Sequence, residues 1–137
     1  MVSESSSPLR IVLAVAVGYG VASALVIAGS SLLLTTLGAP AGPPTTGFLI
    51  GNIAIRIVGT VCAGYACARV APDDRRLISM ALLILFFLAG AAAAFRTAPD
   101  TNQPQGYVAL VSLLGVIGVW AGAMIERAMH GKPSPWA

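Results

Sequence analysis

Long apolar runs alternate with short polar breaks along this chain. The runs cover residues 11–37, 48–68, 77–95 and 107–125, and the one charge inside them is Arg56. A helix needs about 20 apolar residues to cross the roughly 30 Å hydrocarbon core of a bilayer, which each run approaches or exceeds. The pattern predicts an all-α fold, an integral membrane four-helix bundle that forms a single transmembrane domain.

The breaks between the runs are typical of connections outside the membrane. Residues 38–47 hold three prolines, residues 72–76 hold four charges, and residues 96–106 hold two prolines among polar side chains. Proline and glycine clusters end helices and favour turns. The predicted helices therefore cover the four apolar runs themselves, and residues 130–137 are predicted to be a flexible tail.

Basic residues are distributed unequally between the two sides of the predicted bundle. Six lie before the first run, between the second and third, or after the fourth, whereas Arg96 alone lies on the other side. Short loops rich in Lys and Arg stay in the cytoplasm. The count predicts that both termini are cytoplasmic (N-in/C-in). The six are Arg10, Arg69, Arg75, Arg76, Arg127 and Lys132.

Composition supports lipid as the main surroundings of the chain. Of its residues 57% are hydrophobic and 9% are charged, and the mean hydropathy is +0.86. A soluble domain carries about 25% charged residues, so this chain lacks the charges for a water-facing surface. The net charge of +3 is dispersed around the apolar runs, and no basic patch points to nucleic acid.

Small residues recur four apart in the predicted spans. Such rows let helix backbones approach closely in membrane bundles. The rows predict helix–helix contacts within the chain or with other membrane subunits, including a second copy of this chain. The glycines assigned to these contacts are Gly18, Gly59, Gly64, Gly118 and Gly122.

Arg56 is the outstanding candidate for function. A charge near the middle of a span costs about 2.5–3.5 kcal/mol on insertion scales, and Arg56 shares a helix face with the polar residues Asn52 and Thr60. In one interpretation the guanidinium snorkels toward the outer headgroups. In the other it is a buried cation, and Arg56, Asn52 and Thr60 contact a partner's acidic residue or a bound anion.

The remaining polar residues give no catalytic pattern. Glu126 and Arg127 are interpreted as boundary charges, with a titrating carboxylate as the alternative for Glu126. His130 is interpreted as a solvated histidine, with haem or pigment ligation as the alternative. No nucleophile–base pair, acid cluster or metal-ligand spacing is visible, so no enzyme activity, cofactor or metal is predicted.

The end of the second run carries a short motif. Residues 63–72 read Ala-Gly-Tyr-Ala-Cys-Ala-Arg-Val-Ala-Pro. This segment resembles the Gly-Gly-Tyr-x-Ala-Ala-Arg-like pattern that ends the second helix in small uncharacterised bacterial four-helix membrane proteins. Ala63 replaces the first glycine, and Cys67 replaces an alanine. The resemblance implies a bacterial cytoplasmic (inner) membrane and structural roles for Gly64 and Arg69; it implies no activity.

Two functions are consistent with these features. The first is a non-enzymatic accessory or scaffold subunit that packs against a larger membrane complex. It follows from the short loops, the small-residue faces and the isolated charge at Arg56. The alternative is a small oligomeric channel or transporter with an anion site at Arg56. The absence of other charges within the spans favours the accessory subunit.

Overall fold

The computed structural model describes residues 6–38, 42, 44–97 and 106–131, and it is all-α over this part of the chain. Four helices are long and apolar enough to cross a membrane, which confirms the predicted helical fold and number of long helices. In order they are α1 (Ser6–Leu37), α2 (Thr46–Val70), α3 (Arg76–Thr97) and α4 (Tyr107–His130), with a short 3₁₀ turn, η1 (Asp73–Arg75), before α3.

The helices extend beyond the apolar runs that predicted them. α1 begins at Ser6, ahead of residue 11, and α4 continues past residue 125 to His130. Backbone hydrogen bonding does not stop at the first charged residue, so Arg10, Glu126 and Arg127 lie inside helices. His130, the first residue of the predicted tail, is helical, and residues 132–137 lie outside the described residues.

Local chemistry explains where several helices end. Thr45 caps α2, and its hydroxyl oxygen accepts a hydrogen bond from the Phe48 amide at 3.3 Å. Pro72 follows Ala71 at the other end, where a proline disfavours continued helix in the residue before it. α1 is followed by Gly38, whose φ of +76° is the left-handed conformation that commonly closes a helix.

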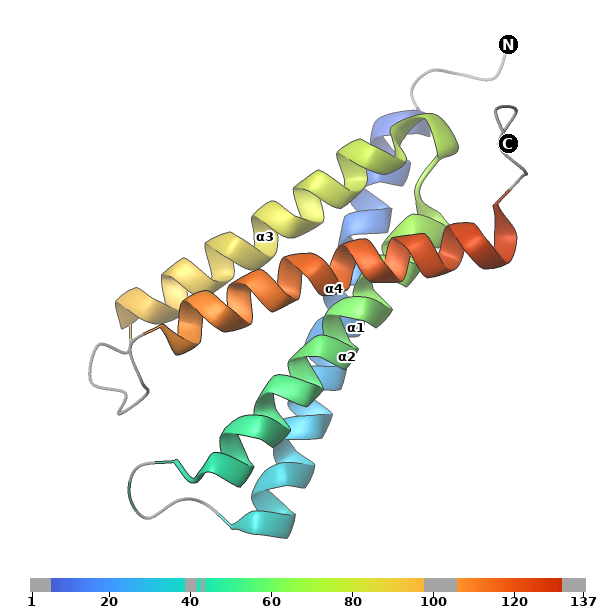
Figure 1. The fold of residues 1–137 in the computed structure, drawn as a ribbon. Helices are drawn as coiled ribbons and strands as arrows, with labels where there is room; N and C mark the ends of the chain where they lie inside the picture. Colours follow the sequence, from blue (N-terminus) through green and yellow to red (C-terminus); the bar gives the residue numbers. More distant parts are fainter. Residues whose placement is uncertain (1–5, 39–41, 43, 98–105, 132–137) are drawn as a thin grey trace.

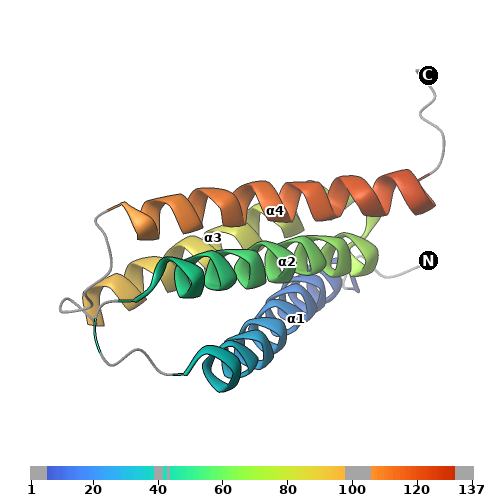
Figure 2. The ribbon, with the colours of Figure 1, turned by 60° about the horizontal axis from the view of Figure 1, so that its bottom comes forward.

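α2 is the central helix of the bundle. It packs along α1 on one side and along α4 on the other, as Figures 1 and 2 show. The described chain ends and the α2–α3 connection lie at one end of the molecule, which we name the terminal end (Figure 1). The last turns of α1 and α3 and the first turns of α2 and α4 lie at the opposite end, which we name the loop end (Figure 1).

Glycines bring the backbones of α2 and α4 together. A Cβ atom added at Gly64 would overlap the carbonyl group of Val119, and one added at Gly122 would overlap the carbonyl oxygen of Val61. One added at Gly118 would overlap the Thr60 hydroxyl. At Gly64 and Gly122 the overlap is with backbone, so no side chain larger than hydrogen fits there without a shift of the helices.

The contact between α1 and α2 is close as well. A Cβ at Gly18 would lie 3.0 Å from the Ala63 carbonyl oxygen, the Cys67 Cβ and Leu83 of α3. One at Gly59 would lie 3.4 Å from a methyl group of Val26, an ordinary contact. All five glycines assigned to packing from the sequence therefore lie at contacts between helices.

α3 is attached mainly through its first half. Leu83 is fully buried, and the rings of Phe86 and Phe87 lie 6.2 and 5.7 Å from that of Tyr19 on α1. Beyond these contacts α1 and α3 diverge toward the loop end (Figure 1). α3 exposes a broad apolar surface that a water-soluble monomer rarely carries; it includes Leu77, Ile78, Leu82, Leu85, Phe86 and Leu88.

The close crossing of α2 and α4 leads to a first prediction. Gly64→Ala should lower the free energy of unfolding by about 1–3 kcal/mol, because the new methyl group meets backbone that cannot rotate away. Gly90→Ala is the matched control, since nothing lies within 4 Å of a Cβ at that position. That change should stabilise α3 by about 0.5–1 kcal/mol. Detergent-solubilised unfolding curves measure both, and equal effects would contradict the close crossing.

Candidate functional site

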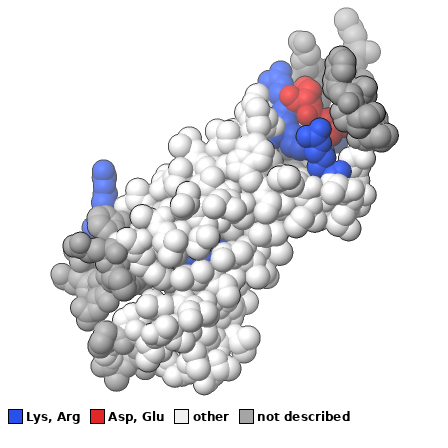
Figure 3. Space-filling view, viewed as in Figure 1, with Lys and Arg blue, Asp and Glu red and all other residues white. Residues whose placement is uncertain are grey.

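Charged side chains gather at the terminal end of the molecule. Figure 3 shows Lys, Arg, Asp and Glu together there, while most of the same face is uncharged. The ion pairs of the described residues lie at this end. They join five residues at the end of α2, in η1 and at the start of α3 to Glu126 or to one another. Those five are Arg69, Asp73, Asp74, Arg75 and Arg76.

A buried carboxylate organises this group of charges. Glu126 of α4 is only 2% exposed. Its Oε2 lies 3.1 Å from Arg76 Nη1 of α3, and its Oε1 lies 3.7 Å from Arg69 Nη1 of α2. Arg76 also donates a hydrogen bond of 2.9 Å from Nη2 to Asp73. Glu126, Arg69 and Arg76, which we name the Glu126 cluster, tie three helices together.

Two polar atoms in the Glu126 cluster are buried without a hydrogen bond to the described residues. They are Arg76 Nε and Glu126 Oε2. The 3.1 Å contact of Oε2 with Arg76 lacks hydrogen-bond geometry, so it acts through charge alone. Arg76 therefore has a donor free for a further acceptor.

The Glu126 cluster was missed by the interpretation of Glu126 as an interfacial boundary charge. Glu126 is a buried partner of two arginines. The signal was present in the sequence, because Gly118, Gly122 and Glu126 follow one another at spacings of four and so share a helix face. Arg69, to which the resemblance assigned a structural role, contacts α4 through Glu126. Which arginines reach Glu126 depends on the crossing of α2 and α4, which spacing along one helix does not define.

Arg56 lies away from this cluster, at a small cavity to which all four helices contribute. The cavity has a volume of about 90 Å³, enough for about three water molecules. Arg56 is exposed at this cavity. We name it the central cavity. Its other lining residues are Ala22, Val26, Thr60, Phe87, Leu88, Ala91, Val111, Ser112 and Gly115.

Among the described residues, no carboxylate forms an ion pair with Arg56. Arg69, at the Glu126 cluster, is thirteen residues further along α2, which corresponds to about 20 Å at 1.5 Å per residue. Glu126 is therefore far beyond the reach of the guanidinium. Asp100 lies outside the described residues.

The residues grouped with Arg56 have different surroundings. Thr60 lines the central cavity, but its hydroxyl donates to the backbone oxygens of Arg56 and Ile57 at 2.9 and 3.0 Å. Asn52 does not line the cavity, and its amide donates to the Tyr107 hydroxyl at 3.0 Å. Asn52 thus joins α2 to the start of α4. Of the three residues, the structure brings Arg56 and Thr60 together.

The face of α2 opposite Arg56 is covered by another helix over part of its length. Ile50 and Val58 are exposed, whereas Val61 and Tyr65 lie against α4 at Gly122. The Tyr65 ring also meets His130 edge-on, with centroids 6.4 Å apart. α4 covers this side of α2 because the glycines of α4 allow close approach.

Comparisons with known proteins give no relative from which a function follows. No family model, curated protein or solved structure matches this chain. The resemblance of residues 63–72 to a bacterial membrane-protein motif stays a prediction. Among the described residues no group of three or more His, Cys, Asp or Glu side chains is placed to hold a metal ion. The arginine at the central cavity is the candidate site.

The Glu126 cluster predicts a clear effect of charge removal. Glu126→Gln should lower the free energy of unfolding by about 1–3 kcal/mol. The loss is smaller than the roughly 3–5 kcal/mol of a fully buried broken pair, because the side chains of Arg69 and Arg76 are 56% and 25% exposed.

Asp74→Asn provides the control for this change. Asp74 is 73% exposed and lies 3.4 Å from Arg75, and exposed pairs contribute about 1 kcal/mol or less. Both variants are compared by the same unfolding titration in detergent. Equal stability of the two variants would contradict a structural role for the buried carboxylate.

Proposed function

We propose that this chain is a multi-pass protein of a bacterial cytoplasmic membrane, with both termini in the cytoplasm. The length and apolar character of four helices support membrane insertion. The terminal end carries Arg69, Arg75, Arg76 and Arg127, whereas Arg96 is the basic residue described at the loop end. The positive-inside rule assigns the more basic end to the cytoplasm. The bacterial assignment rests on the motif at residues 63–72.

Within that membrane, we propose that the protein is a non-enzymatic accessory subunit of a larger membrane complex. The observation that carries this proposal is Arg56, a cation in mid-span that opens on the central cavity and has no acidic partner among the described residues. A cation at this depth is stable when it pairs with an anion or reaches water. An acidic residue on a transmembrane helix of another subunit would supply the pair.

The position of the central cavity suits such a partner helix. Arg56 is exposed at this cavity, so a helix of another subunit can reach the guanidinium. The residues on either side, Val26 of α1 and Leu88 and Ala91 of α3, are apolar. An entering helix would meet an apolar surface around one cation. This arrangement favours a single buried carboxylate over a polar loop.

A small channel or transporter with an anion at Arg56 is the second candidate. The lining of the central cavity by all four helices favours it, since transported ligands bind within bundles. However, the cavity holds only about 90 Å³. The hydroxyls of Thr60 and Ser112 donate to their own helix backbones, at distances of 2.7 to 3.0 Å. Arg56 would therefore be the main ligand for an anion.

The proposed orientation predicts which sites are labelled from outside the cell. A cysteine introduced at Gly42, in the α1–α2 connection, should react with a membrane-impermeant maleimide added to intact cells. One introduced at Asp74, in η1, should react only after the membrane is opened. The native Cys62 and Cys67 lie within α2, and the unaltered chain gives their background. The reverse labelling pattern would overturn the orientation.

The accessory-subunit proposal predicts a split between folding and assembly. Arg56→Leu removes the cost of a mid-span charge, about 2.5–3.5 kcal/mol, so the isolated protein should insert and be at least as stable. Assembly should fail, because a partner's buried carboxylate would lose its counter-ion at a cost of about 3–5 kcal/mol. Arg56→Lys keeps the charge but loses the two-pronged geometry, and it should give a partial defect.

Co-purification from native membranes, followed by native mass measurement, reads out assembly. The matched control is Arg96→Leu, which removes an exposed arginine in the last turn of α3 at the loop end and should leave assembly unchanged. Intact assembly with lost anion flux in liposomes would support the transporter instead. Intact assembly and no change in flux would leave Arg56 as a snorkelling residue and refute both proposals.

A further inference from the structure

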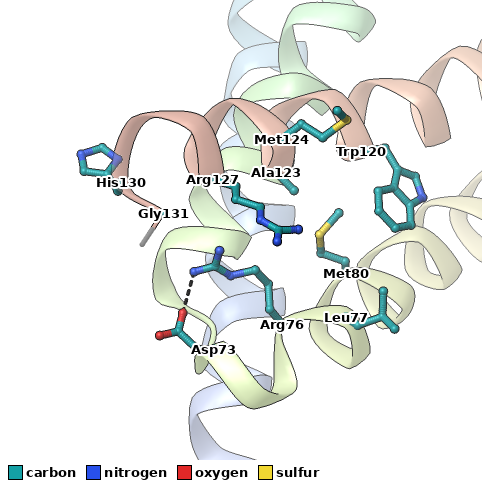
Figure 4. A pocket seen from close by; sticks show the side chains of 10 residues that line it. All are labelled: Asp73, Arg76, Leu77, Met80, Trp120, Ala123, Met124, Arg127, His130 and Gly131. Carbon is teal, nitrogen blue, oxygen red and sulfur yellow. Dashed lines mark hydrogen bonds and ion pairs between the residues drawn. The ribbon is translucent and has the colours of Figure 1, made fainter. Parts of the chain in front are cut away.

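A second and larger cavity lies at the terminal end, between the first turns of α3 and the last turns of α4. Its volume is about 480 Å³. Figure 4 shows the side chains of Arg76 and Arg127 in the opening between the two helices, with Trp120 further along α4. Met80 lies on the wall from α3 and Met124 on the wall from α4. We name this space the α3–α4 cavity.

One cation of the α3–α4 cavity has no counter-charge among the described residues. Arg76 is balanced by Glu126 at 3.1 Å and by Asp73 at 2.9 Å. Arg127 takes part in no ion pair of the described residues, and His130 turns its ring to Tyr65. An anion of single charge would therefore neutralise the cavity. Arginine is the residue that best matches a phosphate group, through parallel N–H donors.

Arg76 also offers a donor to such an anion. Its Nε is buried and has no acceptor among the described residues, although buried donors are nearly always paired. Arg76 lines the α3–α4 cavity, so a rotation of its side chain toward the space would present Nε to a ligand oxygen. Arg76 and Arg127 together provide donors from two helices to one anionic group.

The polarity of the α3–α4 cavity changes along the helices. Trp120 precedes Arg127 by seven residues on α4, which places it about 10 Å deeper from the terminal end. On α3, Met80 lies one turn deeper than Arg76. Trp120 and Met124 are 47% and 66% exposed. Cationic groups therefore stand at the outer edge and an apolar surface with an aromatic ring stands below them, an order that matches a phospholipid at a bilayer surface.

We propose that the α3–α4 cavity binds an anionic phospholipid, with its phosphate between Arg127 and Arg76 and an acyl chain on Trp120 and Met124. The proposal rests on the membrane embedding and orientation proposed above, because it places Arg127 at the cytoplasmic headgroups, where anionic lipids are recognised by basic pockets between helices. A free phosphate ion would use the same two arginines, but it would leave the apolar wall uncovered.

Trp120 gives a direct reporter for the bound lipid. The full chain carries two tryptophans, Trp120 and Trp136, and Trp136→Phe leaves Trp120 as the sole emitter. This variant is reconstituted in phosphatidylcholine vesicles that contain a second lipid with brominated acyl chains. The brominated lipid is either phosphatidylglycerol or phosphatidylcholine. Brominated phosphatidylglycerol should quench Trp120 with an apparent association constant about fivefold higher than that of brominated phosphatidylcholine. One arginine near anionic lipid contributes roughly this factor.

Arg127→Gln should make the apparent association constants of the two brominated lipids equal. Arg75→Gln is the matched control, because Arg75 is a terminal-end arginine that does not line the cavity, and it should change the preference by less than about twofold. Equal quenching by the two lipids in the unaltered cavity would overturn the proposal. An equal loss of the preference for phosphatidylglycerol in the two variants would also overturn it. That result would indicate a general attraction of anionic lipid to the basic surface.

Two further readings separate this proposal from others. Inorganic phosphate added at millimolar concentration should leave quenching by brominated phosphatidylglycerol unchanged. A loss of this quenching on addition of phosphate would assign the site to a soluble phosphate instead. Quenching of Trp120 by brominated phosphatidylcholine tests membrane embedding itself. If neither lipid quenches Trp120, the embedding fails together with the lipid site. If both quench equally, embedding stands and the lipid site fails.

Discussion

The close approach of α2 to α4 is the constraint on which the rest of the structure depends. Gly64 lies directly against the Val119 backbone, and Gly122 lies against the Val61 carbonyl. Because α4 runs close to α2 in this way, Glu126, one turn beyond Gly122, comes within 3.7 Å of Arg69. The carboxylate is then buried and also pairs with Arg76. Backbone contact and ion pairing thus stabilise the same end of the molecule, where α3 enters the bundle.

The same constraint bears on the unpaired cation at the central cavity. α2 is packed on both sides by α1 and α4, and Arg56 is exposed at the central cavity, which all four helices line. All described carboxylates belong to the terminal end, about 20 Å away along α2. Among the described residues, the carboxylates therefore all lie at one end of the molecule, and Arg56 at the central cavity has none within reach. This asymmetry is the physical basis for proposing a partner at Arg56.

Much of the helical fold could be predicted from the sequence, because 20-residue apolar runs and their polar breaks set helix number directly. Four of the five packing glycines were also identified from spacing within each helix, and Gly64 from the resemblance of residues 63–72 to a known motif. The partners of those glycines were not, since pairing between helices depends on crossing angles that no periodicity encodes. Glu126 and Asn52 show the limit clearly. Both are polar residues near helix ends, and their partners, Arg76 and Tyr107, lie on helices distant in the sequence.

The central claim is that an acidic transmembrane helix of another protein occupies the space beside Arg56. A photo-crosslinking amino acid at Ala91, which lines the central cavity, tests it in native membranes. The account predicts a crosslink to one other membrane protein, at a residue within a turn of an intramembrane Asp or Glu. Gly90, which is exposed with nothing within 4 Å of a Cβ, is the control position and should not give this product. Crosslinks from Ala91 to lipid or to this chain alone would contradict the account.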